Sequence, residues 1–115
     1  MPLTDAAKNA MLDHLAGLAQ LVSLHWAEPG TTGANELAGG SPPYARQAIT
    51  WNPASAANLD NNANPVFDVG AGSTVAFFGL WSADGLTFYG SGSLTPEVFN
   101  GQGTYTLDDL DVTAA

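Results

Sequence analysis

Two histidines, His14 and His25, are the side chains best suited to acid–base chemistry near neutral pH. A nucleophilic enzyme needs such a base beside a serine and a carboxylate. The sequence has no Gly-x-Ser-x-Gly elbow, and Gly90-Ser91-Gly92-Ser93 does not have that pattern. We therefore expect His14 to be solvated, His25 to pack within a sheet, and the protein to have no catalytic residue and not to be an enzyme. A hydrolase built from His25 and a carboxylate distant in sequence is the alternative.

The acidic run Asp108-Asp109-Leu110-Asp111 offers oxygen ligands of the kind that calcium prefers. It lacks the glycine at the sixth position and the distal glutamate of an EF-hand loop, so we interpret it as a solvated strand end. The chain has no cysteine, which excludes disulfides, thiolate zinc sites and thiol nucleophiles. No glycine-rich segment has the spacing of a nucleotide-binding loop. We expect neither a metal site nor a cofactor.

The charge balance is strongly acidic. Eleven Asp and Glu residues face two basic residues, Lys8 and Arg46, which gives a formal net charge of -9. Such a field repels phosphate groups, so we expect neither nucleic acid nor an anionic membrane as a partner. No apolar run approaches the roughly 20 residues of a membrane-spanning helix. The first residues also lack the basic and apolar regions of a secretory signal.

Six aromatic residues lie on or beside predicted strands: Trp26, Tyr44, Trp51, Trp81, Phe88 and Tyr89. An aromatic ring exposed on a sheet can stack on a sugar or anchor a protein interface. In a domain of this size we expect most of these rings to be buried in the core, with one or two at an interface.

Residues 4–17 have the pattern of a helix. Thr4 suits the N-cap, and Asp5 suits the positive end of the helix dipole. Apolar residues then recur at spacings of four and three, which predicts one buried stripe formed by Ala7, Met11, Leu15 and Leu18. This stripe either covers one face of the chain's own sheet or docks on a neighbouring subunit.

Alternation of apolar and polar residues, together with turn residues, predicts the strands. In the first of them Val22, Leu24 and Trp26 share one face. The predicted strands are 21–26, 44–51, a weak edge strand at 55–59, 65–69, 73–81, 86–91 and 104–112.

Asp84-Gly85 predicts a hairpin between the strands at 73–81 and 86–91. We expect Gly90, Gly92 and Pro96 to end the second of them. The fold class that follows is mostly β: a small antiparallel sandwich or barrel of about five to seven strands with one N-terminal helix. A chain of 115 residues suits one hydrophobic core, so we expect a single domain over 1–115, with its β part at about 20–112.

A long segment rich in glycine, proline and threonine, 27–43, separates the first two strands. Long loops in small domains are typically functional. We expect interaction residues in this loop and on the strands beside it: Glu28, Pro29, Thr31, Thr32, Asn35, Glu36, Tyr44, Trp26 and Trp51.

Four segments of the chain carry a family resemblance: LTDAAKNAMLDHL, VSLHWAEPGTTGANELAGGSPPYARQAITW, PVFDVGAGSTVAFFGLWSADGLTFYGSGSL and FNGQGTYTL. Together they resemble a family of short virion proteins from tailed phages of actinobacteria, labelled tail fibre or minor capsid proteins. The resemblance covers nearly the whole chain. It implies a virion protein that is made in the cytoplasm of the bacterial host and has no catalytic residue.

The two labels imply different places in the particle. A tail fibre that projects a tip needs a shaft of repeats, coiled coil or collagen-like sequence, and none of these patterns occurs here. We therefore expect a minor capsid or decoration protein on the outer surface of the head, which contacts the major capsid protein, copies of itself, or both, as a homo-oligomer or multicopy assembly. The alternative is a tail fibre or tail-tip protein that binds host-surface carbohydrate.

Overall fold

Helix α1 (Asp5–Leu18) opens the structure, a computed structural model that describes residues 2–108 and 110–113. Asp109 of the acidic run lies outside the described residues. The Thr4 hydroxyl accepts a hydrogen bond from the N–H of Ala7 at 3.2 Å, which confirms the predicted N-cap. After Leu18 the backbone becomes extended at Ala19, so the helix ends one residue beyond its predicted limit.

The buried face of α1 is not the predicted stripe. Met11 is 55 % exposed and Leu18 39 % exposed, whereas Leu12 is 4 % exposed. The reason is that the side chains of Asn9 and Asp13 accept hydrogen bonds from the backbone N–H groups of residues 57 and 54, which turns the face around Leu12 toward the segment before β3. The helix therefore packs on β3 of its own chain.

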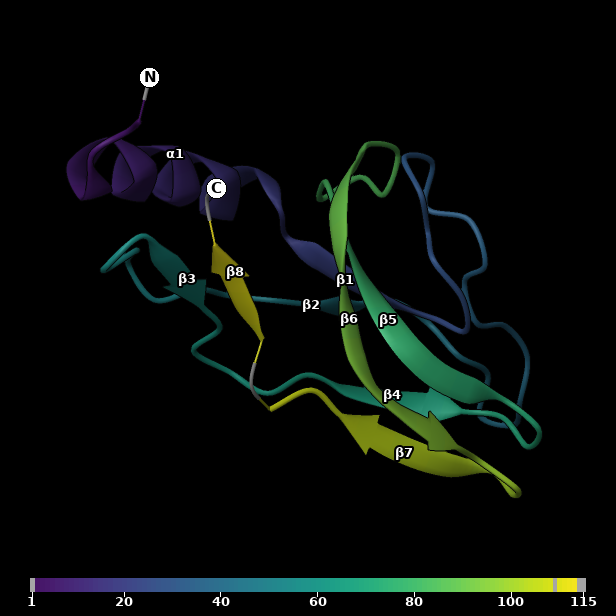
Figure 1. Cartoon of the computed structure of the whole chain (residues 1–115). Coiled ribbons are helices and arrows are strands. Elements are labelled where there is room, and N and C mark those ends of the chain that lie inside the picture. Colours follow the sequence, from purple (N-terminus) through teal and green to yellow (C-terminus); the bar gives the residue numbers. More distant parts are fainter. Residues whose placement is uncertain (1, 109, 114–115) are drawn as a thin grey trace.

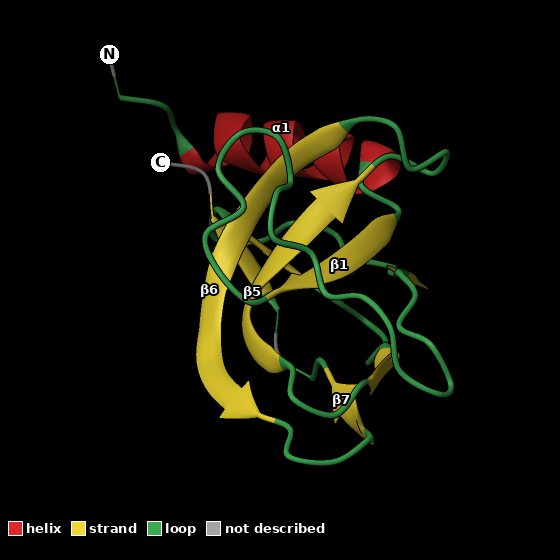
Figure 2. Ribbon diagram, turned by 90° about the vertical axis from the view of Figure 1, so that its right-hand side faces the viewer, coloured by secondary structure: helices red, strands yellow, loops and turns green. Residues whose placement is uncertain are grey.

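Four strands form the main antiparallel sheet, in the order β2-β1-β5-β6 (Figure 1 and Figure 2). They are β1 (Leu21–His25), β2 (Gln47–Ala48), β5 (Thr74–Trp81) and β6 (Phe88–Val98). Two further antiparallel pairs join β3 (Asn58–Asp60) to β8 (Asp111–Thr113) and β4 (Val66–Val69) to β7 (Gly103–Thr106). This confirms the predicted fold class, a mostly β sandwich with one helix.

The hairpin between β5 and β6 is present, with Gly85 in a left-handed conformation at φ +75°. Gly90, Gly92 and Pro96 do not end β6, contrary to the prediction, and β6 continues to Val98. The reason at Gly92 is packing, because a Cβ there would lie 2.5 Å from the ring of Phe78. The interruption expected at Pro96 is a bulge in a continuous strand.

Two other predicted strands differ from the structure. The strand at 44–51 is reduced to β2, because Tyr44 and Arg46 turn toward the loop before them and make hydrogen bonds there. The strand at 104–112 is divided into β7 and β8, because Leu107 and Leu110 between them are buried, at 2 % and 1 % exposure. These two leucines anchor the connection to the core.

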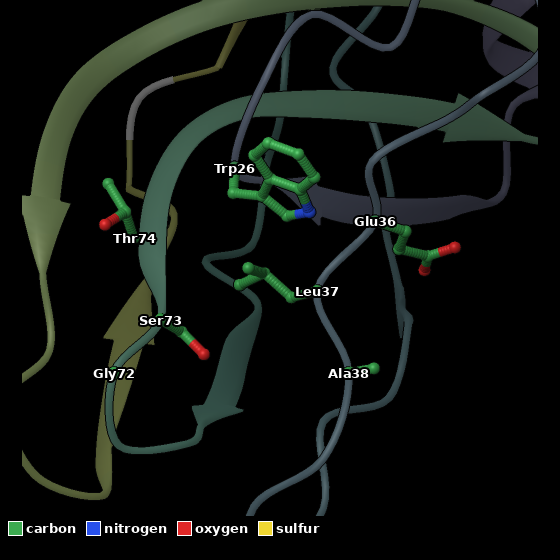
Figure 3. A pocket seen from close by; sticks show the side chains of 7 residues that line it. All are labelled: Trp26, Glu36, Leu37, Ala38, Gly72, Ser73 and Thr74. Carbon is green, nitrogen blue, oxygen red and sulfur yellow. The ribbon is translucent and has the colours of Figure 1, made fainter.

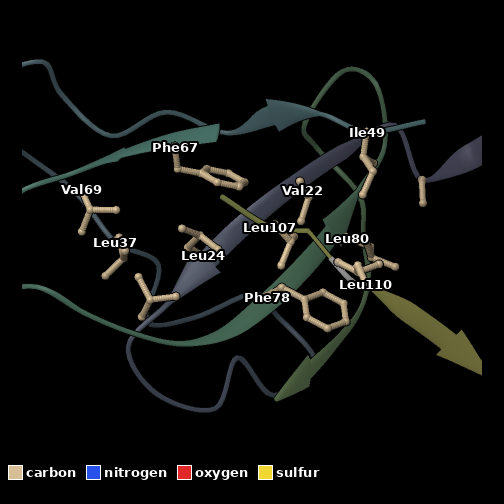
Figure 4. Close-up of a cluster of buried hydrophobic side chains, with 12 residues drawn as sticks. Val22, Leu24, Leu37, Ile49, Phe67, Val69, Phe78, Leu80, Leu107 and Leu110 are labelled. Atoms are coloured by element: carbon tan, nitrogen blue, oxygen red, sulfur yellow. The ribbon is translucent and has the colours of Figure 1, made fainter. Parts of the chain in front are cut away.

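The core lies between the main sheet and the β4–β7 pair (Figure 4). Val22, Leu24, Phe78 and Leu80 come from the sheet, and they meet apolar side chains from β4 and the β7–β8 connection. Each fully buried side chain of this size contributes about 1.5–3 kcal/mol. The twelve residues of the cluster are Ala19, Val22, Leu24, Leu37, Ile49, Phe67, Val69, Val75, Phe78, Leu80, Leu107 and Leu110.

Two glycines of β6 provide a matched test of the packing. Gly92→Ala places a methyl group against the ring of Phe78, and we expect it to lower the free energy of unfolding by about 1–3 kcal/mol. At Gly90 an added Cβ meets no atom within 4 Å, so Gly90→Ala should stay within about 0.5 kcal/mol of the wild type. Urea unfolding followed by circular dichroism measures both. Equal stability of the two variants would contradict the packing of Phe78 on Gly92.

Candidate functional site

The loop between β1 and β2, residues 26–46, folds back over the second face of the main sheet. Its effect is visible in β1, where Val22, Ser23, Leu24 and His25 are all buried. Val22 and Leu24 face the core, so Ser23 and His25 face the loop, since successive side chains of a strand point to opposite faces. β1 is therefore an interior strand with a polar pair on its loop side.

His25 occupies the centre of this buried polar face. The carbonyl of Ala34 lies 2.7 Å from Nδ1, and because a carbonyl can only accept, Nδ1 carries the proton. Nε2 then accepts from the hydroxyl of Ser23 at 2.6 Å, and that hydroxyl accepts from the indole N–H of Trp81 at 2.8 Å. Burial lowers the pKa of His25 below its ordinary value of 6.5, so the ring is neutral at neutral pH. His14, in contrast, is exposed.

The loop is fastened to the sheet by Glu36. Its carboxylate accepts hydrogen bonds from Arg46 Nε at 3.0 Å, Arg46 Nη2 at 2.9 Å and the Tyr44 hydroxyl at 2.7 Å. Burial by itself would raise the pKa of Glu36, but these hydrogen bonds and the charge of Arg46 outweigh it and hold the pKa below its ordinary value. The Tyr44 oxygen also accepts from the N–H of Leu24 at 2.9 Å, and burial raises the pKa of Tyr44.

Arg46 extends the same network to the β5–β6 turn. Its Nη1 donates to the carbonyl of Gly85 at 3.0 Å, and its guanidinium lies 3.7 Å from the ring centroid of Trp81. The hydrogen bonds with Glu36 raise the pKa of Arg46, which stays charged. We call the set Ser23, His25, Glu36, Tyr44, Arg46 and Trp81 the loop clamp.

The polar centre of the loop clamp is buried and fully engaged. Both ring nitrogens of His25 are engaged, and neither His25 nor Ser23 exposes any surface. Gly79 of β5 allows this close packing, because a Cβ there would lie 2.6 Å from the Ser23 hydroxyl. Within the described part of the chain, no three His, Asp or Glu side chains gather as metal ligands, and no helix is long and apolar enough to cross a bilayer.

Beside the loop clamp lies a groove of about 510 Å³, which we call the Trp26 groove (Figure 3). Trp26, at the end of β1, is 55 % exposed, and Leu37 opposite it is buried. Ser73 and Thr74 line the other side of the groove; the Ser73 side chain points toward the segment with Leu37 and Ala38, whereas the Thr74 side chain points away from Trp26. The complete lining is Trp26, Glu36, Leu37, Ala38, Gly72, Ser73 and Thr74.

The structure separates the expected interaction residues into groups. Trp26 and Glu36 line the groove, and Tyr44 belongs to the loop clamp. Pro29 is buried, whereas Glu28, Thr31 and Thr32 are exposed on the loop. Asn35 donates to the carbonyl of residue 28 at 3.0 Å and shapes the loop. Trp51 lies elsewhere, half-buried, with its indole N–H bonded to the carbonyl of residue 19 at 2.9 Å.

No functional role was predicted from the sequence for Ser23, Arg46, Ser73 or Thr74. Ser73 and Thr74 follow a turn with two glycines, Gly70 and Gly72, and that turn was the one sign that they face open space. Arg46 was visible as the chain's single arginine, and so as a partner for one carboxylate in an acidic protein. Which carboxylate it would bind could not be read from the sequence.

A family model described as podophage GP4 fiber I protein gp80 matches residues 2–97, well over half of the 115-residue chain. The chain belongs to this family. It is a bacteriophage structural protein of the fibre type, with its place in the virion. The matched region of the gp80 family contains α1, the loop clamp and the Trp26 groove. No curated protein and no solved structure matches the chain.

Membership of the gp80 family supports one of the two expected descriptions, tail fibre and minor capsid protein, more than the other. Its description names a fibre, so the tail-fibre alternative fits better than the expected minor capsid protein. It names a podophage and does not speak to actinobacterial hosts. A virion structural protein is confirmed.

The loop clamp predicts how stability depends on pH. The unfolded chain protonates His25 as the pH falls through about 6.5, but the folded protein resists this because its His25 pKa is lowered. The folded state therefore binds fewer protons, and its stability falls as the pH drops through and below about 6.5, with a slope of at most about 1.4 kcal/mol per pH unit. Glu36, whose pKa is also lowered, extends the loss below about pH 4.5.

The measurement is urea unfolding at several pH values for the wild type, His25→Gln and His14→Gln. We expect His25→Gln to be less stable at neutral pH and to lose less stability on acidification. His14→Gln should keep the slope of the wild type, because His14 is exposed. Parallel pH profiles for the wild type and His25→Gln would show that His25 is not held neutral by the fold.

Proposed function

We propose that this protein is a non-enzymatic component of a phage tail fibre and that it binds host-surface carbohydrate in the Trp26 groove. The observation that carries the proposal is the exposed indole of Trp26 at the mouth of a groove, in a chain of a fibre family. The nearest expectation from sequence was the alternative of a carbohydrate-binding tail protein.

Trp26 has the properties of a stacking platform for a sugar ring. Its side chain is 55 % exposed, yet its backbone is fixed, because its N–H donates to the carbonyl of Asn35 at 3.1 Å and the preceding His25 is fully buried. A large flat ring presented from an ordered backbone loses little conformational freedom on binding. The other two tryptophans do not suit this role, since Trp81 is 8 % exposed and Trp51 is half-buried.

Polar groups around Trp26 can orient a stacked sugar. Ser73 lines the groove, and within the described residues its hydroxyl takes part in no hydrogen bond. Glu36 also lines the groove, with its carboxylate turned away from Trp26 and bonded to Arg46 and Tyr44. Small-molecule sites commonly combine an apolar surface with a few such polar groups. The net charge of -9 disfavours anionic polymers, so the ligand we propose is a neutral or amino-sugar glycan.

Binding without hydrolysis is the function that the groove supports. Glycosidases use two carboxyl groups on either side of the scissile bond, one of them with a raised pKa. The lining of the groove includes one carboxylate, Glu36, whose pKa is lowered and whose oxygens are bonded to Arg46 and Tyr44. Glu36 is therefore poorly suited to donate a proton.

Replacement of Trp26 tests the carbohydrate proposal. Trp26→Ala should weaken binding to surface polysaccharide extracted from the phage's host at least about tenfold, because stacking of one aromatic ring contributes on the order of 1.4 kcal/mol or more. Leu86→Ala, at another highly exposed apolar residue, is the matched control and should bind as the wild type does. Isothermal titration calorimetry measures binding, and circular dichroism verifies the fold. A folded wild type that binds no polysaccharide, or a Trp26→Ala variant that binds equally, would rule the proposal out.

The place in the particle is tested separately. Gold-labelled antibody against the purified chain should mark the tail of intact virions in electron micrographs. Particles of a mutant phage lacking the chain are the control and should carry no label. Label on the head would instead support a capsid decoration protein, which we expected because the sequence has no pattern of a fibre shaft.

A further inference from the structure

A second groove, of about 410 Å³, shares no residue with the Trp26 groove. One wall is the segment 89–93 of β6, and the other is 111–113 of β8. Leu15, Phe78 and Leu80 line it between these walls. We call this hollow the strand groove, because each of its walls belongs to a strand.

The backbone of β6 has unused hydrogen-bonding groups along the strand groove. Leu24 of β1 bonds through its N–H to Tyr44 and through its carbonyl to Leu37, so both groups point away from β5. In an antiparallel pair of strands, two opposite residues either bond to each other or both point their backbone groups away from each other. Phe78, opposite Leu24, therefore turns its backbone toward β6 and bonds to its partner Gly92.

It follows that Ser91 and Ser93, on either side of Gly92, point their backbone N–H and carbonyl groups away from β5. β6 is the last strand of the sheet, and Figure 2 shows it along the outer side. Among the described residues no backbone hydrogen bond reaches Ser91 or Ser93 from outside the sheet. The edge offers donors and acceptors at the spacing of a further strand.

The strand groove also has room for side chains. Gly90 has no side chain, and a Cβ built there meets no atom within 4 Å. Phe78 and Leu80 form an apolar floor at 7 % and 3 % exposure, with half-buried Leu15 and Val112 beside them. Every second side chain of an added strand would enter this apolar space.

This part of β6 lacks the features that normally protect an edge strand. Exposed edges are typically short, charged, bulged or interrupted by proline. The opposite edge of the sheet, β2, has only two residues. In β6, the segment 90–93 carries no charge and no proline and pairs with β5 in continuous register; one bulge lies before it, between Phe88 and Gly90, and the other bulge and Pro96 come after Ser93.

We propose that the strand groove accepts an extended segment of another virion protein, which adds to β6 as a strand and carries lysine or arginine beside its apolar residues. Charge selects this occupant over a second copy of the chain. Asp111 stands in the groove wall, Glu28 lies 3.5 Å from the Ser91 hydroxyl, and the whole chain has a net charge of -9. Two copies would repel each other at this edge, whereas a basic segment is attracted. The inference is independent of carbohydrate binding.

The test uses the full chain and two peptide libraries of the same design. Each has valine at alternate positions and random residues between them, with lysine at both ends in one library and glutamate in the other. We expect the immobilised wild type to enrich peptides from the lysine library only, with dissociation constants at least about tenfold weaker for Gly90→Phe, which fills the groove. Thr95→Phe, outside the groove lining, is the matched control and should bind as the wild type does. Trp26→Ala should also bind peptide normally.

Amide hydrogen exchange gives an independent readout of strand addition. The bound peptide should slow exchange at Ser91 and Ser93 and leave Gly92, already bonded within the sheet, unchanged. Absence of enrichment from the lysine library, or equal binding by Gly90→Phe, would overturn the proposal. So would a dimer of the free wild type in sedimentation experiments that Gly90→Phe converts to a monomer, since the edge would then pair with a second copy.

Discussion

The bidentate ion pair between Arg46 and Glu36 joins parts of the chain that the sheet alone would leave apart. Glu36 belongs to the long loop, Arg46 precedes β2, and Arg46 also reaches the carbonyl of Gly85 in the β5–β6 turn. Both side chains are mostly shielded from solvent, at 26 % and 22 % exposure, so the pair is stronger than one on an open surface. While this ion pair is intact, the loop covers β1 and shields Ser23 and His25 from solvent.

The same glutamate connects the loop clamp with the Trp26 groove. One side of the segment 34–37 bonds to β1 and to the buried histidine, and the other side forms a wall of the groove. This wall of the groove is thus formed by residues whose polar groups are already hydrogen-bonded. Such a surface is prepared for a ligand before the ligand arrives, which favours recognition over chemical turnover.

Local sequence patterns predicted the features that depend on local physics. Thr4 as N-cap, the Asp84-Gly85 hairpin and the two-residue alternation of β1 all follow from near neighbours. The errors lie where distant residues decide. Leu12, and not the predicted Met11, lies on the buried face of α1, because the backbone N–H groups of residues 54 and 57 bond to side chains of the helix. Trp26 continued the alternation of Val22 and Leu24 but lies just beyond the strand, so periodicity could not reveal its exposure.

The arrangement around β3 has a mechanical consequence. The first element, α1, and the last, β8, both pack on this one short strand, at the end of the molecule away from β4 and β7 (Figure 1). Tension applied between α1 and β8 would therefore load the β3–β8 ladder of three residue pairs first. The hydrogen bonds between β3 and β8 would therefore break first. The main sheet, with the loop clamp and the Trp26 groove, would not be loaded until they had broken.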